Sequence, residues 1–301
     1  MNVKMTYLLS LPILLLITSC QNNTTTDKET PITNFIQKVS APLKTYTTFD
    51  RSSCVDRIQQ KIENKEALVI HLMVPLCDND NQGIVKVNSR LGDGMNLRTN
   101  LYWGSKYGVK NFFHKLSPWK LLESKKDMSG HILERIILYR KYPNGAKAYL
   151  VADAYRGDKM KACLVDYFAA ISGNSKEILS VDDQSISIKS DADLIVFNGH
   201  NGLMDYDMDL VYNHDDKIRD AAVIGCASHS YFLEHLKHAK AYPLLMTTNL
   251  MAPEAYVAAA LVDSWVQQYE EEQIKHEVGK AYHKYQQCGI KGATRLFKNG
   301  W

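Results

Sequence analysis

Two apolar stretches decide the fold, DLIVFNGH at residues 193–200 and AAVIGC at residues 221–226. Each is a nearly unbroken apolar run that ends at a glycine followed by a side chain able to do chemistry. Such runs are typical of strands buried on both faces, as in a parallel sheet. The runs ALVIHLMV at 67–74 and YPLLMT at 242–247 have the same character. We therefore expect a mainly parallel sheet with these strands in its interior.

Segments with hairpin or helical patterns separate these strands. PNG at 143–145 predicts a hairpin between strands at 134–142 and 147–155, and ISI at 186–188 predicts a short edge strand. The spacing of apolar residues predicts helices at 53–64, 101–116, 158–171, 231–239, 253–269, 277–287 and 291–297. Short buried strands alternating with helices predict an α/β fold, a three-layer sandwich around a mainly parallel central sheet.

The N-terminus has the features of an export signal. The chain begins with MNVK, and an uncharged apolar run follows at 7–17. This run is shorter than the about 20 residues that span a bilayer, and it has the length of a signal-peptide core. It closes on ITSC at 17–20, which resembles the lipobox of bacterial lipoproteins. The resemblance implies cleavage before Cys20 and acylation of Cys20 with diacylglycerol and a further acyl chain such as palmitate.

This resemblance divides the chain into a signal peptide at 1–19, a polar tether at 20–31 and a single α/β domain at 32–301. Two or more acyl chains anchor a protein stably, so we expect a membrane as a partner through the lipid. Gln21 stands where an Asp would favour the inner membrane in enterobacterial lipoproteins. We therefore expect the outer membrane of the cell envelope, on its periplasmic or surface side.

The composition is that of a globular protein and argues against a nucleic-acid role. Hydrophobic residues make up 45% of the chain and aromatic residues 10%. The formal net charge is +3, and no basic patch with interleaved aromatic residues occurs. Five of the six cysteines remain besides Cys20, so at least one of them is unpaired within the chain. None of them forms a CxxC pair, so we expect no zinc site.

Two reactive side chains follow the strands that decide the fold. His200 comes after the strand at 194–199, and Cys226 comes after the strand at 221–225. In open α/β sheets, ligands bind at the carboxyl ends of the strands. If the two strands are neighbours, His200 and Cys226 share one rim of the sheet. A thiol with a free pKa of about 8.5 needs such a base to become a nucleophile, and the base can then protonate a leaving amine.

At this point the chain resembles the caspase-like cysteine peptidases, the group of caspases, legumains, gingipains and clostripain. In that group one hydrophobic strand ends in His followed by Gly, and the next ends in a small residue followed by the nucleophilic Cys. The resemblance implies a caspase-like or flavodoxin-like sheet. It also implies that Cys226 is the nucleophile and His200 the general acid and base. The backbone N–H groups of Gly202 and Cys226 would form the oxyanion hole. The resemblance further implies a peptide or protein substrate in the envelope. The sequence departs from the pattern in Asn201, which separates the His from the Gly, and in a short interval between His200 and Cys226.

Acidic residues follow the same strand ends. Asp205 and Asp207 come after the His200 turn, Asp78 and Asp80 after the strand at 67–74, and Asp153 ends another strand. We interpret these five as candidates for a substrate cleft. Asp78 and Asp80 belong to the long polar loop at 77–100, and loops of this length are often functional.

No cofactor is expected, although calcium is a secondary candidate at two acidic runs. The run DNDNQG at 78–83 opens like a calcium-binding loop, but Ser89 stands where the bidentate Glu should be. The alternating Asp205 and Asp207 lack the Gly and the distal Glu of such a loop. A second hypothesis belongs to another class of protein, a catalytically inactive surface lipoprotein that keeps the α/β fold and binds a protein or glycan partner.

Overall fold

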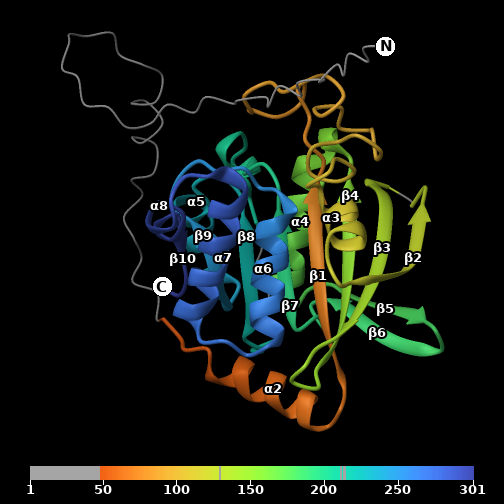
Figure 1. Ribbon diagram of the computed structural model, residues 1–301, viewed down its shortest axis with the longest axis vertical. Coiled ribbons are helices and arrows are strands. Elements are labelled where there is room, and N and C mark those ends of the chain that lie inside the picture. The colour runs from red at the N-terminus through yellow and green to blue at the C-terminus, as the bar shows by residue number, and fades with distance from the viewer. Residues whose placement is uncertain (1–47, 129, 211, 213–214) are drawn as a thin grey trace, which may run out of the picture. The chain divides into compact units, whose positions relative to one another are not determined.

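Strand β1 (Ala67–Pro75) lies inside an eight-stranded sheet with the order β10-β9-β8-β7-β1-β4-β3-β2 (Figure 1). The computed structural model describes residues 48–128, 130–210, 212 and 215–301. The signal peptide, Cys20 and the tether therefore lie outside the described residues. None of the helices in the described part is long and apolar enough to cross a membrane.

The five interior strands run parallel. β1 pairs in parallel with β4 and β7, β7 with β8, and β8 with β9, whereas β2, β3 and β10 join the edges antiparallel. The other strands of this sheet are β2 (Lys120–Lys126), β3 (Ile132–Lys141), β4 (Lys147–Tyr155), β7 (Leu194–Asn198), β8 (Arg219–Ile224), β9 (Ala241–Thr247) and β10 (Phe297–Lys298). The expectation of a mainly parallel sheet is confirmed, and β3 and β4 form the predicted hairpin.

A separate antiparallel hairpin, β5 (Lys176–Val181) and β6 (Gln184–Lys189), lies beside the sheet. The expected edge strand at 186–188 is part of β6. The helices are α2 (Ser52–Glu63), α3 (Val109–Lys115), α4 (Met160–Ile171), α5 (Ser228–His238), α6 (Ala255–Val266), α7 (Glu271–Gln286) and α8 (Ile290–Arg295), with 3-10 turns η1 (Gly157–Lys159) and η2 (Gly202–Met204).

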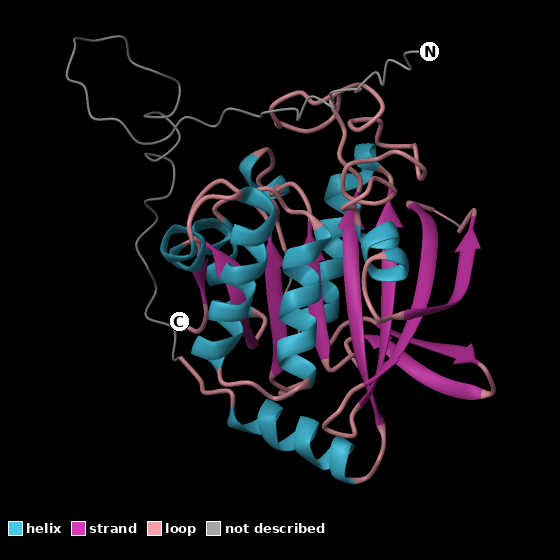
Figure 2. Cartoon of the chain, viewed as in Figure 1, coloured by secondary structure: helices cyan, strands magenta, loops and turns pink. Residues whose placement is uncertain are grey.

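Alternate residues of the strands fill two separate cores. On β1, Leu68, Ile70 and Leu72 pack with apolar residues of α3, α6 and α7, whereas Val69 and Met73 pack with α4 and α5. Because successive side chains of a strand point to opposite faces, a sheet with two apolar faces must be covered on both sides. Figure 2 shows helices on both faces of the strands. The observed architecture is therefore a mixed α/β fold with a large, mostly parallel central sheet flanked by helices.

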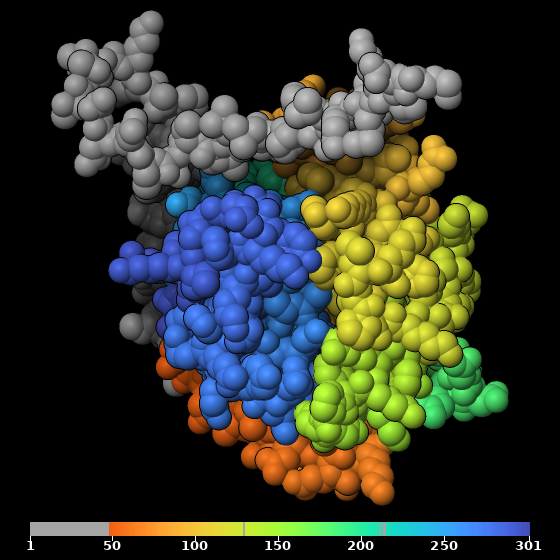
Figure 3. All heavy atoms as spheres, viewed as in Figure 1, coloured from red at the N-terminus to blue at the C-terminus, as the bar shows by residue number. Residues whose placement is uncertain are grey.

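Aromatic side chains pack tightly against one another in the helices that cover one face of the sheet. The rings of Phe112 on α3 and Tyr256 on α6 lie 6.4 Å apart, and Tyr256 stacks on Tyr285 of α7 at 4.4 Å. Offset or edge-on contacts of this kind stabilise by about 0.5–1.5 kcal/mol beyond the buried area. In Figure 3 the atoms of α6 and α7 (blue) meet those of the α3 region (yellow) over this face.

The predicted helix at 101–116 is wrong in its first half, since α3 begins only at Val109. Residues 101–108 form turns because the chain doubles back on itself there. A Cβ on Gly104 would lie 2.1 Å from the carbonyl oxygen of Leu97, and one on Gly108 would lie 2.5 Å from the carbonyl group of Trp103. The apolar residues that suggested helical spacing are instead packed inside these turns.

Candidate functional site

The ends of β7 and β8 lie side by side at the carboxyl edge of the sheet. The two strands are parallel neighbours, and Asn198 pairs with Ile224 as the last step of the register. The N–H of Gly199 donates to the carbonyl oxygen of Ile224 at 3.0 Å. A Cβ on Gly225 would lie 2.8 Å from the carbonyl oxygen of Gly199, so the chain needs glycine there to approach so closely. The two strands are therefore neighbours, which meets the condition set in the sequence analysis, and His200 and Cys226 follow at the same edge.

Cys226 stands at a sharp turn between β8 and α5. The next residue, Ala227, has a φ of 47°, which an alanine rarely adopts, and α5 begins directly after it. The Cys226 Sγ lies 3.4 Å from both the backbone N and the carbonyl oxygen of Met251. Burial raises the pKa of the Cys226 thiol, and the backbone N–H groups of Met251 and Cys226 offset only part of that effect. The resting thiol is therefore protonated at neutral pH.

His200 is buried and has a carboxylate partner. Its Nε2 lies 2.7 Å from the Oδ2 of Asp205, and the side chain of Asp205 is only 17% exposed. Burial acts to raise the pKa of Asp205, but hydrogen bonds from His200 and from the Gly83 N–H bring it below its ordinary value. Asp205 is thus an anion that fixes the orientation of the imidazole, a role that the sequence analysis did not give it.

Asn201 ties the His200 turn to the Cys226 turn. Its Nδ2 donates to the carbonyl oxygen of Cys226 at 2.8 Å, and its Oδ1 accepts from the Leu203 N–H at 3.1 Å. The residue that separates His200 from Gly202 in the sequence therefore fastens the two reactive turns together. No hydrogen bond joins the Cys226 thiol to the His200 imidazole in the described part of the chain.

The loop at 77–100 reaches the same rim. The N–H of Gly83 donates to the Oδ2 of Asp205 at 3.0 Å, and the Tyr206 hydroxyl donates to the carbonyl oxygen of Asn81 at 3.1 Å. The loop encloses a hollow of about 430 Å³ lined in part by Asp78 and Asp80. Asp78 is buried and accepts the N–H groups of Asp80 and Asn81, so it mainly holds its own turn, whereas Asp80 is exposed.

The remaining candidates lie in different surroundings. Asp207 is exposed beside the rim, and Gly202 begins η2, where it packs against Met160 of α4. Asp153 does not reach the rim. It is fully buried within β4, and its two carboxylate oxygens accept from Arg135 and lie against His71, so it offers no free carboxylate to a substrate.

Within the described residues, no group of three or more metal-ligating side chains gathers at the rim or elsewhere. Comparisons of the chain with protein-family models, with curated proteins and with solved structures give no match. What the chain can do must therefore be argued from the rim itself, where a thiol, an imidazole and a carboxylate follow neighbouring parallel strands of an α/β sheet.

Proposed function

We propose that the chain is a lipid-anchored hydrolase of the cell envelope, a caspase-like cysteine endopeptidase that uses Cys226 and His200. The observation that carries the proposal is the partly buried His200–Asp205 contact at the strand end beside Cys226, with Nε2 and Oδ2 2.7 Å apart. A carboxylate that fixes an imidazole next to a thiol-bearing turn is the arrangement that nucleophilic catalysis needs. The wider resemblance in the order of strands supports the caspase-like or flavodoxin-like architecture.

In this proposal the thiol is activated during the reaction rather than before it. His200 takes the proton from the Cys226 Sγ as the sulfur attacks the substrate carbonyl carbon. The backbone N–H groups of Gly202 and Cys226 would hold the oxyanion. The imidazolium then gives its proton to the leaving amine as the C–N bond breaks, which leaves a thioester that a water molecule hydrolyses. The raised pKa of the Cys226 thiol is consistent with such general-base activation, since no resting thiolate is required.

The test is cleavage of a protein substrate, such as denatured casein, by the purified chain and its variants. Cys226→Ala and His200→Gln should each abolish cleavage while the circular dichroism spectrum stays unchanged. Cys288→Ala is the matched control because Cys288 is a free and exposed cysteine with no role in the proposed mechanism. Full activity of either rim variant would overturn the mechanism, whichever substrate is used.

One observation favours a second candidate function, an inactive α/β surface lipoprotein that binds a protein or glycan. The Cys226 thiol contacts the Met251 backbone rather than His200, and burial raises its pKa. A peptidyl chloromethyl ketone at neutral pH distinguishes the two proposals, because it binds as a substrate analogue and carries its own alkylating group. An enzyme should show alkylation of Cys226 that His200→Gln slows by at least about tenfold, because the base contributes roughly 10²–10⁴-fold in such steps. A binding module should show no dependence on His200.

A further inference from the structure

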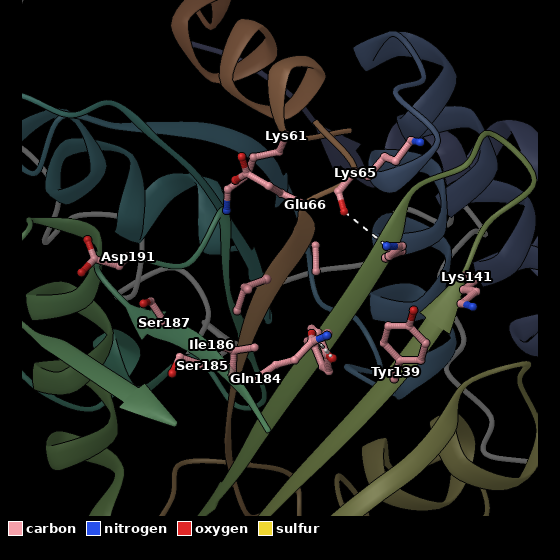
Figure 4. A pocket seen from close by; sticks show the side chains of 14 residues that line it. Lys61, Lys65, Glu66, Tyr139, Lys141, Gln184, Ser185, Ile186, Ser187 and Asp191 are labelled. Carbon is pink, nitrogen blue, oxygen red and sulfur yellow. Dashed lines mark hydrogen bonds between the residues drawn. The ribbon is translucent and has the colours of Figure 1, made fainter. Parts of the chain in front are cut away.

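A second hollow lies at the opposite edge of the sheet from the reactive rim. It has a volume of about 560 Å³, within the roughly 300–1,000 Å³ of small-ligand sites. The amino ends of β1 and β4, the end of β3, the end of α2 and the β6 strand of the small hairpin surround it (Figure 4). Its lining is mostly polar and includes four lysines, Lys61, Lys65, Lys141 and Lys147, together with Glu66 and Asp191.

Within the described residues, three of its four lysines lack an anionic partner. Lys61 is neutralised by Asp193, with Nζ and Oδ2 2.7 Å apart. Lys65, Lys141 and Lys147 form no ion pair with a carboxylate in the described residues, and the Lys147 Nζ donates only to the carbonyl oxygen of Lys65 at 3.3 Å. Of the two acidic residues in the lining, Asp191 pairs with Lys176, so the three lysines outnumber the one remaining carboxylate, that of Glu66, and the hollow presents an excess of positive charge.

The sheet register places two of these lysines directly opposite each other. Lys141 on β3 pairs with Lys147 on β4, two positions beyond the pair Tyr139 and Tyr149 and therefore on the same face of the sheet. Like charges directly opposite each other on neighbouring strands are destabilising. Such a pair is explained if an anion occupies the hollow between the two ammonium groups.

The rest of the lining suits a sugar. The rings of Tyr139 and Tyr149 lie 5.0 Å apart at an angle of 46°, and Tyr139 is partly open to the hollow. The Tyr149 hydroxyl donates to the Oε1 of Gln184 at 2.9 Å, and Ser185 and Ser187 bring further hydroxyl groups. An aromatic face beside amide and hydroxyl groups can contact a pyranose ring and exchange hydrogen bonds with its hydroxyls.

We propose that this hollow binds an acidic oligosaccharide, with a carboxylate or sulfate group seated between Lys141 and Lys147 and a sugar ring on Tyr139. The site is independent of Cys226 and His200, so it stands whether or not the chain is a hydrolase. Lysine ammonium groups act as point charges towards such anions, and the hydroxyl-rich wall distinguishes a sugar from an acidic peptide.

The experiment is isothermal titration of the full chain with a galacturonate hexasaccharide, with uncharged maltohexaose and with a hexaglutamate peptide. The galacturonate should bind, and raising the salt from about 0.1 M to about 1 M should weaken it, because the screening length falls from about 10 Å to about 3 Å. The double variant Lys141→Gln, Lys147→Gln should weaken binding at least about tenfold, since charge-assisted hydrogen bonds are lost. Tyr139→Leu should weaken binding without changing its salt dependence.

Lys280→Gln is the matched control, because Lys280 is an exposed lysine on α7 whose partner is Glu277. It should leave the affinity unchanged. The proposal is overturned if the double variant binds galacturonate as tightly as this control, if maltohexaose binds equally well, or if hexaglutamate binds as tightly as galacturonate. The last result would assign the hollow to acidic peptides instead.

Discussion

Replacing Asp153 by Asn tests whether this carboxylate is a structural clamp rather than part of a cleft. Asp153 is fully buried on β4, where Arg135 of β3 donates to Oδ1 at 2.6 Å and to Oδ2 at 2.7 Å, and the His71 Nε2 lies 3.0 Å from Oδ2. Arg135 also donates to the carboxylate of Glu177 on β5. The network therefore fastens the small hairpin to the main sheet through buried charges.

The size of the effect follows from the pKa of Asp153. Burial by itself would raise that pKa, but hydrogen bonds from Arg135 and His71 lower it from 3.8 to about 2. Because each pKa unit corresponds to about 1.4 kcal/mol, the lowering from 3.8 to about 2 corresponds to roughly 2 kcal/mol of folding free energy. Because the Asn variant also leaves Arg135 with an incomplete set of acceptors, we expect a loss of about 3 kcal/mol at neutral pH.

The sign of the pH dependence is fixed by the lowered pKa. A carboxyl group whose pKa is depressed in the folded state stabilises the protein above its unfolded value of 3.8, and this contribution is lost as the pH falls towards about 2. The stability difference between wild type and Asp153→Asn should therefore shrink between about pH 5 and about pH 2. Urea unfolding followed by tryptophan fluorescence at several pH values measures that difference.

Asp158→Asn is the matched control. A hydrogen bond from Arg156 likewise lowers the pKa of Asp158, but the side chains of Arg156 and Asp158 are 34% and 29% exposed. Because of solvent screening, such a surface pair contributes little to stability. If Asp153→Asn costs no more than Asp158→Asn, the clamp interpretation is wrong. A loss of cleavage by a fully folded Asp153→Asn variant would return Asp153 to the substrate cleft.

Three further predictions concern the rim. Gly225→Ala should lower the free energy of unfolding in urea by about 1–3 kcal/mol, because its Cβ would lie 2.8 Å from the carbonyl oxygen of Gly199 at the neighbouring strand end. Gly292→Ala is the control and should not lower it, because a Cβ there meets open space within a helix. Alkylation of Cys226 by iodoacetamide without substrate should rise about tenfold per pH unit through pH 9, since burial raises the pKa of the thiol; a plateau at neutral pH would contradict this. Asp205→Asn should lower kcat for casein cleavage at least about tenfold, because His200 loses the carboxylate that orients it, and KM should stay nearly unchanged. An unaltered kcat would mean that Asp205 has no part in the mechanism.

The parallel core of the fold could be predicted because its signal is local. The runs at 67–74, 193–200 and 221–226 are apolar on both faces, as expected of buried strands. A polar or reactive residue follows each run and marks where the buried strand ends. The shared edge of His200 and Cys226 then follows from topology. Strands β2 and β5 could not be predicted this way, because both lie at edges, where charged residues face solvent and hide the strand pattern.

The details of the site depend on contacts that are distant in the sequence. The partner of the Cys226 thiol is Met251, on the connection after β9, and no local pattern indicates that contact. The start of β8 was missed for a similar reason, since Asp220 is fully buried and pairs with Arg51, 169 positions away. The His200–Asp205 contact is different. It spans only five positions, so the acidic run after the turn was a usable signal that we interpreted as part of a cleft.

The two candidate sites lie at opposite ends of the same strands, and this separation has a consequence for function. β4 runs from Lys147 beside the lysine-lined hollow to Tyr155 near the rim, and its nine residues at about 3.3 Å each span about 30 Å. If both proposals hold, a peptide of a few residues bound at Cys226 would end short of the hollow, whereas a glycosylated protein would be large enough to occupy both sites. The variant Lys141→Gln, Lys147→Gln should therefore leave kcat/KM for short peptides unchanged and raise KM only for substrates that carry acidic glycans. If it impaired short-peptide cleavage in a folded protein, the two ends of the sheet would be coupled through the fold rather than bridged by the substrate.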